Sequence, residues 1–226
     1  MKDLQEYIIE SSNSLNDNIM SKIDNKENII ANDANIKDIV NYAIKKLGKD
    51  ADLNFIDVYN VTNMSKLFYK SSFNGDISKW NVSNVKTMEN MFYEAKFNKN
   101  IFNWDVSNVE NMQYMFTNSK FNQDISNWDV SSVKDMSWMF HFSKFNNDIS
   151  NWDVSNVKNM FCMFANSKFN QDISKWDVSI VKDMYGMFAN SKFDQDISNW
   201  DVSKVKNLYK MFDKCPIKDE YKPKFK

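Results

Sequence analysis

Apolar residues recur along most of this chain with a period of 24 residues, and Trp marks the period most clearly. Counted from each Trp, Phe lies at −7, Ile at −3, Val at +2 and +5, Met at +8 and Met-Phe at +11 and +12. The Trp column consists of Trp80, Trp104, Trp128, Trp152, Trp176 and Trp200. Periods of this size are typical of repeat proteins, in which stacked units share one continuous core. The sequence therefore predicts an elongated stack of coils.

Each repeat unit is expected to contain two kinds of element. The part F-N-x-D-I-S-x-W alternates apolar and polar residues, which favours a short extended segment. The part S-x-V-K-x-M-x-x-M-F spaces its apolar residues by three and four, which is typical of a helix. Its Ser is a candidate N-cap, and Ser107 with Glu110 matches the S-x-x-E capping box. We expect one short strand, a turn and one short helix per unit, with parallel strands stacked about 4.8 Å apart.

Three regions follow from this pattern. Residues 49–215 hold one partial and six full 24-residue units, the partial one visible in FIDVYNVTNMSKLF. In residues 1–48, the segment 36–47 has an amphipathic stripe and precedes Gly48, so it predicts a helix that caps the first coil. Residues 1–30 are expected to form a second helix or an arm that pairs with another chain. Residues 216–226 are a polar C-terminal tail that would protect the last open edge.

Composition excludes several functions. The 29 basic and 30 acidic side chains nearly cancel, and all the basic residues are Lys, which disfavours a nucleic-acid-binding surface. Cys162 and Cys215 lie too far apart for a metal motif and are expected to be reduced, mostly buried thiols. No signal peptide and no membrane span is recognisable, which predicts a cytoplasmic location as the sequence is written. A cell-surface location would require an export signal that has been trimmed away.

The motif FNxDISxWDVSxVxxMxxMFxxS, which recurs over residues 49–215, closely resembles the repeat of BspA-like leucine-rich-repeat surface proteins. The same repeat occurs in mycoplasma lipoproteins. The resemblance implies an α/β solenoid, a leucine-rich-repeat-like right-handed coil. It also implies a role in surface attachment and protein–protein contact, and it supplies no catalytic residues. Relatives often carry a signal or lipid-anchor sequence, and neither is visible here.

Repeated carboxylates are the first candidates for chemistry. One column contains Asp76, Asp124, Asp148, Asp172 and Asp196, and another contains Asp105, Asp129, Asp153, Asp177 and Asp201. Carboxylate pairs can serve a glycosidase or bind Ca²⁺. An active site needs one distinct place, however, whereas these residues recur in every coil. We therefore expect them to accept hydrogen bonds from turn amides, and we expect no catalytic residue, metal or cofactor.

The positions that vary between units are the candidates for recognition, because the constant ones build the core. They include an aromatic set with the chain's one His: Tyr114, Trp138, His141, Phe142, Phe161, Tyr185 and Tyr209. Trp and Tyr are favoured binding anchors. The alternative is that these rings pack between coils and that His141, with no nucleophile or acid beside it, is a partly packed surface residue. A second candidate surface is a polar ladder with Gln123, Asn147, Gln171 and Gln195, which would otherwise only keep the protein soluble.

These observations favour a non-enzymatic protein–protein interaction module on a repeat scaffold, of the bacterial surface or adhesion type. Its expected partner is a protein, with neither nucleic acid nor a membrane span involved and with oligomerisation through residues 1–30 left open. One alternative is a carbohydrate-binding or calcium-dependent adhesive surface. The more remote alternative is a solenoid hydrolase or lyase.

Overall fold

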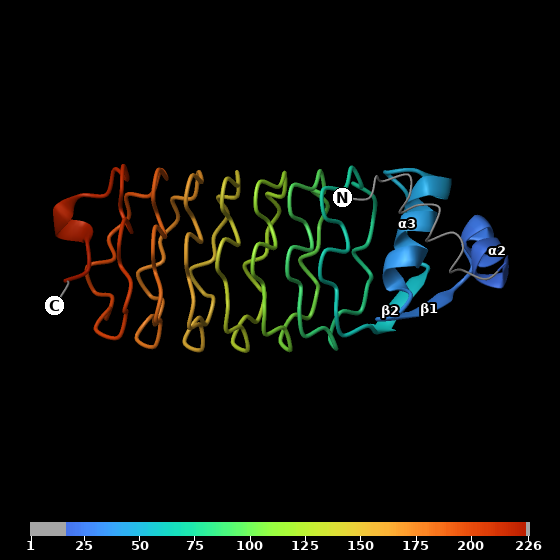
Figure 1. Ribbon diagram of the computed structural model, residues 1–226, viewed down its shortest axis with the longest axis horizontal. Helices are drawn as coiled ribbons and strands as arrows, with labels where there is room; N and C mark the ends of the chain where they lie inside the picture. Colours follow the sequence, from blue (N-terminus) through green and yellow to red (C-terminus); the bar gives the residue numbers. More distant parts are fainter. Residues whose placement is uncertain (1–16, 225–226) are drawn as a thin grey trace.

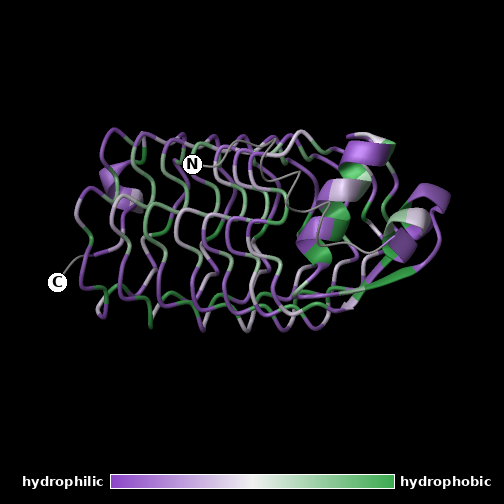
Figure 2. Cartoon of the chain, turned by 45° about the vertical axis from the view of Figure 1, so that its right-hand side comes forward, coloured by the Kyte–Doolittle hydropathy of each residue, from purple (hydrophilic) through white to green (hydrophobic). Residues whose placement is uncertain are grey.

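The structure is a computed structural model that describes residues 17–224. The chain winds into coils that stack along one long axis, with the helices and strands of the N-terminal region at one end (Figure 1). The handedness of the coil and its likeness to leucine-rich repeats stay predictions. Hydrophobic stretches recur at corresponding places in successive coils (Figure 2), and the buried side chains form one continuous core from Ile23 to Ile217.

The N-terminal region contains α2 (Asp17–Asn25), β1 (Ile29–Asn32), α3 (Ile36–Leu47) and β2 (Ile56–Asn60). Strands β1 and β2 pair in parallel, with Ile29 opposite Ile56. Helix α3 spans the segment that the amphipathic stripe predicts and ends at Gly48, where φ is 96°. It buries Ile39, Val40 and Ala43 in the same core as the repeats. The second helix or arm predicted for residues 1–30 lies outside the described residues up to position 16, and beyond that position α2 supplies a helix.

The segment M-x-x-M-F, for which we expected a short helix, forms a ribbon of overlapping turns in every coil. In one coil the amide of Met91 donates to the carbonyl oxygen of Met88 (3.0 Å), and the amide of Tyr93 donates to that of Asn90 (3.2 Å). Between these local bonds, the amide of Asn90 donates to Gln113 of the next coil (2.9 Å). Alternate amides thus bond within the coil and between coils, so this wall satisfies its backbone without a helix.

A positive φ interrupts helical geometry twice per coil, at Trp+10 and Trp+14. Position +10 holds Asn90, Tyr114, Trp138, Cys162, Gly186 and Lys210, and position +14 holds Glu94, Asn118, Phe142, Asn166, Asn190 and Lys214, all with φ between 50° and 61°. This left-handed conformation suits Gly and Asn and is strained for other L-residues. The prediction of one short helix per unit is wrong for this reason. The inward-facing residues do follow at steps of three and four, but left-handed residues lie between them.

The expected strands at F-N-x-D-I-S-x-W are also absent from the six full units. Apart from one bridge between Asp52 and Asp76, the parallel bridges between coils fall instead at Trp+7, where Thr87, Asn111, Asp135, Asn159, Asp183 and Asn207 form one ladder. Other bonds link the F-N-x-D-I-S-x-W segments. For example, the Trp128 indole Nε1 donates to the carbonyl oxygen of Ile101 in the preceding coil (3.2 Å).

At the C-terminal end, the 3-10 helix η1 (Asp219–Tyr221) follows the last coil, and the Ile197 amide donates to the Tyr221 carbonyl oxygen (3.0 Å).

Candidate binding surface

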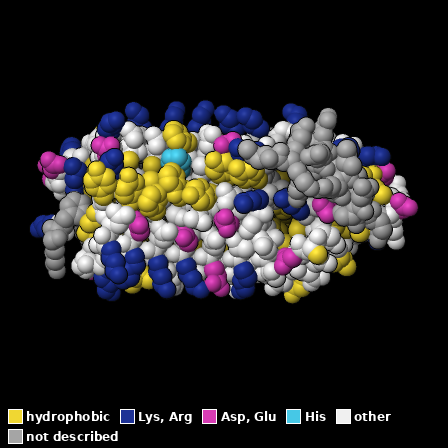
Figure 3. All heavy atoms as spheres, in the orientation of Figure 1, with side chains coloured by type: hydrophobic (Ala, Val, Ile, Leu, Met, Phe, Trp, Pro, Cys, Tyr) yellow, Lys and Arg dark blue, Asp and Glu magenta, His cyan; other side chains and the backbone are white. Residues whose placement is uncertain are grey.

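The M-x-x-M-F segments of successive coils form one side of the stack, the turn wall. Seven aromatic side chains make a line of ring contacts along it, and we call this line the aromatic row. Its members are Tyr69, Tyr93, Tyr114, Trp138, Phe161, Tyr185 and Tyr209, with neighbouring ring centroids 4.9, 6.4, 5.7, 5.3, 4.8 and 5.8 Å apart in that order. Apolar side chains gather in a band along one face of the stack, with the His beside it (Figure 3). The row is therefore a long apolar strip.

All seven residues singled out from the sequence belong to this region. Five are members of the row, and the other two adjoin it: the His141 ring lies 4.4 Å from both the Trp138 ring and the Phe142 ring. Phe142 and Tyr209 are 55% and 65% exposed, whereas the others are partly buried. The rings thus pack against one another between coils, as the second alternative expects, while part of the strip stays open to solvent, and their role in recognition stays a prediction.

The sequence interpretation missed Tyr69 and Tyr93. Both lie on the coil wall at Trp+13 or its equivalent in the partial unit, whereas the later members come from +9 and +10. They stack on each other (4.9 Å, 12°) and continue the row towards the N-terminal end. The candidate set included the Trp+13 position only at His141, so Tyr93 at the same position of an earlier coil was not identified.

Three of the six contacts along the row are stacked, so one face of each ring in these pairs is covered by the neighbouring ring. The pairs Tyr114–Trp138 and Phe161–Tyr185 stack with interplanar angles of 12° and 10°. Stacked rings turn their edges, rather than their faces, to solvent. Sugars and nucleobases bind aromatic side chains mainly by stacking on a free face, so this arrangement favours a partner that packs side chains against ring edges.

Three aromatic residues of this surface occupy left-handed backbone positions. Tyr114 and Trp138 lie at Trp+10 with φ of 57° and 61°, and Phe142 lies at Trp+14 with φ of 52°. Other coils place Asn90 or Gly186 at +10 and Asn at +14, which relieves the strain. A bulky ring in this conformation costs about 1–2 kcal/mol relative to an unstrained site, so the local backbone does not explain why aromatic residues stand here.

His141 is held neutral by its surroundings. Burial among Trp138 and Phe142 lowers the pKa of its imidazole to about 4. Its Nε2 lies 3.4 Å from the Asn166 Nδ2 of the next coil. Burial and these ring contacts make His141 part of the apolar strip.

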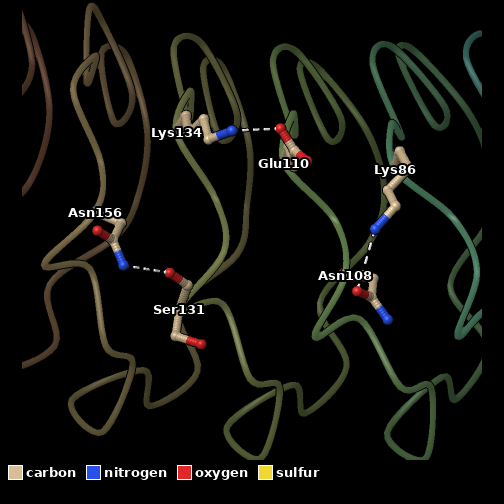
Figure 4. A network of polar contacts seen from close by, with 6 residues as sticks. All are labelled: Lys86, Asn108, Glu110, Ser131, Lys134 and Asn156. Atoms are coloured by element: carbon tan, nitrogen blue, oxygen red, sulfur yellow. Dashed lines mark hydrogen bonds and ion pairs between the residues drawn. The ribbon is translucent and has the colours of Figure 1, made fainter.

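A shallow polar hollow lies beside the row, around Trp+3 to Trp+6 of the middle coils. Here Glu110 replaces the Lys of other coils and forms an ion pair with Lys134, which lowers the pKa of the Glu110 carboxyl. Ser132 replaces an Asn that elsewhere bridges coils, as Asn156 does by donating to the Ser131 carbonyl oxygen (2.8 Å) (Figure 4). Since its one carboxylate is already paired, the hollow offers no free acid or base.

The repeated Asp residues have structural partners. In the column at Trp−4, Oδ1 of each carboxylate accepts a hydrogen bond from the Ser amide two residues later, at 2.8–2.9 Å. In the column at Trp+1, Oδ1 of each Asp likewise accepts from the Ser amide two residues later, at 2.9–3.1 Å. These amides lower the pKa of Asp148 and Asp172. Within residues 17–224 no cluster of His, Cys, Asp and Glu is arranged to hold a metal ion.

The polar ladder that was the second candidate also bonds internally. Gln123 and Gln195 donate through Nε2 to Asn98 and Asn170 of the preceding coil, each at 3.2 Å, and Asn147 donates to Asn122. Its side chains thus serve contacts between coils. The aromatic row remains the stronger candidate, because its exposed apolar surface has no partner of this kind.

In the part of the chain that the structure covers, no helix has the length and apolar character needed to cross a membrane. Comparisons with curated proteins and with solved structures gave no match. A family model matches residues 34–144 and again residues 141–221, and so covers both the α3 region and the repeats. By these matches, the chain belongs to the family described as "Mycoplasma protein of unknown function, DUF285".

Proposed function

We propose that this protein is a non-enzymatic module that binds a protein partner along the aromatic row. One observation carries the proposal: the chain places Trp138 and Phe142 at left-handed positions where some of its other coils use Asn. Phe142 contacts the His141 ring but is 55% exposed, so its packing offsets only part of the strain. Exposed aromatic anchors on a rigid scaffold are typical of protein-binding surfaces.

The resemblance to BspA-like surface proteins adds a finer part to the proposal. We propose a right-handed, leucine-rich-repeat-like coil and an adhesion-type role in attachment to another protein. The three stacked ring pairs, in which one face of each ring is covered, argue against the carbohydrate alternative. The carboxylates bonded to Ser amides argue against the calcium-dependent one, because Oδ1 of each already accepts a hydrogen bond within its own coil.

Retention of partners by immobilised protein tests this function. The double variant Trp138→Asn, Phe142→Asn removes both rings and installs residues that the same positions hold in other coils, at Asn90 and Asn118. We expect it to fold as the wild type does and to lose the proteins that the wild type retains saturably from a cell-surface extract. Treating the extract with protease should remove the retained material, whereas glycosidase should not.

The matched control is Phe102→Ser. Phe102 is a partly exposed ring at Trp−2, away from the aromatic row, where the other full units have Ser. This control should retain the same proteins as the wild type. Equal retention by the double variant and the wild type would remove the aromatic row as the binding surface.

A further inference from the structure

Two columns of Lys border the aromatic row. The first lies at Trp+6, before the chain enters the turn wall, and contains Lys86, Lys134, Lys158, Lys182 and Lys206. The second lies at Trp+16, after the chain leaves the wall, and contains Lys96, Lys120, Lys144, Lys168 and Lys192. All ten residues are exposed. Figure 3 shows basic side chains along both edges of the face that carries the apolar band.

Carboxylates on this face are fewer than the Lys residues, and several of them are bonded within the protein. Asp135 accepts from the Ser137 amide at Oδ1 (2.8 Å) and from Asn159 at Oδ2 (3.0 Å). Glu110 pairs with Lys134, and Glu94 pairs with Lys70 at 3.5 Å. The column at Trp+16 holds no acidic residue in any full unit from Lys96 to Lys192. Although the chain has a net charge near zero, the surroundings of the row are therefore basic.

The acidic residues of the repeats concentrate elsewhere in each coil. The Asp columns at Trp−4 and Trp+1 lie in the part of the unit that contains the Trp, and their carboxylates point to Ser amides. Charge is thus separated around the coil rather than mixed. A surface with an apolar centre and basic edges attracts a partner with the complementary pattern, since electrostatic complementarity fixes orientation and raises association rates.

On the basis of the proposed function, we propose that the partner is an acidic polypeptide segment that lies lengthwise on the aromatic row. Its apolar side chains contact the ring edges around Trp138 and Phe142, and its Asp and Glu side chains pair with the Lys columns on both sides. The three stacked ring pairs leave fewer free faces for a polysaccharide or a single-stranded nucleic acid, which favours a polypeptide. The narrow strip between parallel charge columns favours a linear segment over a lipid surface.

Selection from a random dodecapeptide display library tests this composition without presuming a sequence. The baits are the wild type, the variant Lys120→Glu, Lys144→Glu, Lys168→Glu and the double variant Trp138→Asn, Phe142→Asn. We expect peptides selected on the wild type to be enriched in Asp and Glu together with Leu, Phe or Trp. Their affinity should fall about tenfold on the charge-reversed bait, where three exposed ion pairs are replaced by like charges, and it should weaken as ionic strength rises.

The matched control is Lys79→Glu, Lys99→Glu, Lys175→Glu, which changes the net charge equally at exposed positions away from the row. It should bind the selected peptides as the wild type does, and circular dichroism melting should show that all baits fold. Peptides that need Trp138 and Phe142 but show no acidic enrichment would overturn the acidic partner and leave the proposed function standing. Peptides insensitive to the Trp138→Asn, Phe142→Asn change would count against both.

Competing polyanions complete the test. Heparin, a dT20 oligonucleotide and phosphatidylglycerol vesicles are titrated against the wild type and the double variant. We expect weak binding that is equal for both proteins, because the Lys columns are intact and the rings add nothing. Tight binding of any of these probes that depends on Trp138 and Phe142 would replace the polypeptide by that class of ligand.

Discussion

Substitutions at Phe142 can measure the backbone strain on which the binding proposal rests. Its φ of 52° lies in the left-handed region, and 55% of its surface is exposed. Replacement by Ala removes the ring and keeps a Cβ in the strained conformation. Replacement by Asn removes the same ring but installs a residue that tolerates this conformation, as Asn118 and Asn166 do one coil away on either side.

The two substitutions should therefore differ mainly by the backbone cost. Full burial of a Phe side chain is worth about 1.5–3 kcal/mol, so the half-exposed ring of Phe142 contributes roughly 1 kcal/mol. A left-handed conformation costs an ordinary L-residue about 1–2 kcal/mol, of which Asn recovers a large part. We expect Phe142→Ala to lower the free energy of unfolding by about 1 kcal/mol and Phe142→Asn to leave it nearly unchanged.

Thermal and urea unfolding, followed by circular dichroism, measure this difference. For a chain of this size, 1 kcal/mol corresponds to about 2–4 °C in melting temperature. Phe140 serves as the internal reference, because its side chain is fully buried two residues away and its replacement by Ala should cost about 3–5 kcal/mol. If Phe142→Ala is as stable as Phe142→Asn, the position carries no strain and the argument for a functional ring there is refuted.

Three further predictions follow from other parts of the structure. A Cβ at Gly75 would lie 1.9 Å from the Ala51 carbonyl oxygen, so Gly75→Ala should destabilise the junction between cap and repeats, which amide hydrogen exchange would detect as faster exchange in α3. Trp128→Phe leaves the Ile101 carbonyl without its indole donor and should cost about 1–3 kcal/mol in urea unfolding. The one imidazole, that of His141, should titrate by NMR with a pKa of about 4. Because the unfolded chain binds this proton near pH 6.5, stability should decrease as pH falls from about 6.5 to about 4, and His141→Asn should remove that contribution.

The sequence predicts the positions of the core better than the backbone that supports them. The columns of Trp, Phe, Ile, Val and Met are buried as the period indicates. The M-x-x-M-F spacing, however, fits a helix and a ribbon of overlapping turns equally well, because both turn every third and fourth side chain to one side. Only the residues at Trp+10 and Trp+14 distinguish them. Asn118, Asn166 and Asn190 at +14, and Gly186 at +10, are the residues that left-handed positions favour.

The positions that the aromatic row occupies in successive coils favour the proposed role in binding over a role in stability alone. The buried Phe column keeps one position in every coil, so Phe92 and Phe116 stack at 5.6 Å with an interplanar angle of 1°. The surface row instead shifts from Trp+13 at Tyr93 to Trp+10 at Trp138 and to Trp+9 at Tyr185. Stacking between coils would be served best by one constant position. We expect such a change of position, with the rings still in contact, where the whole surface is complementary to a partner.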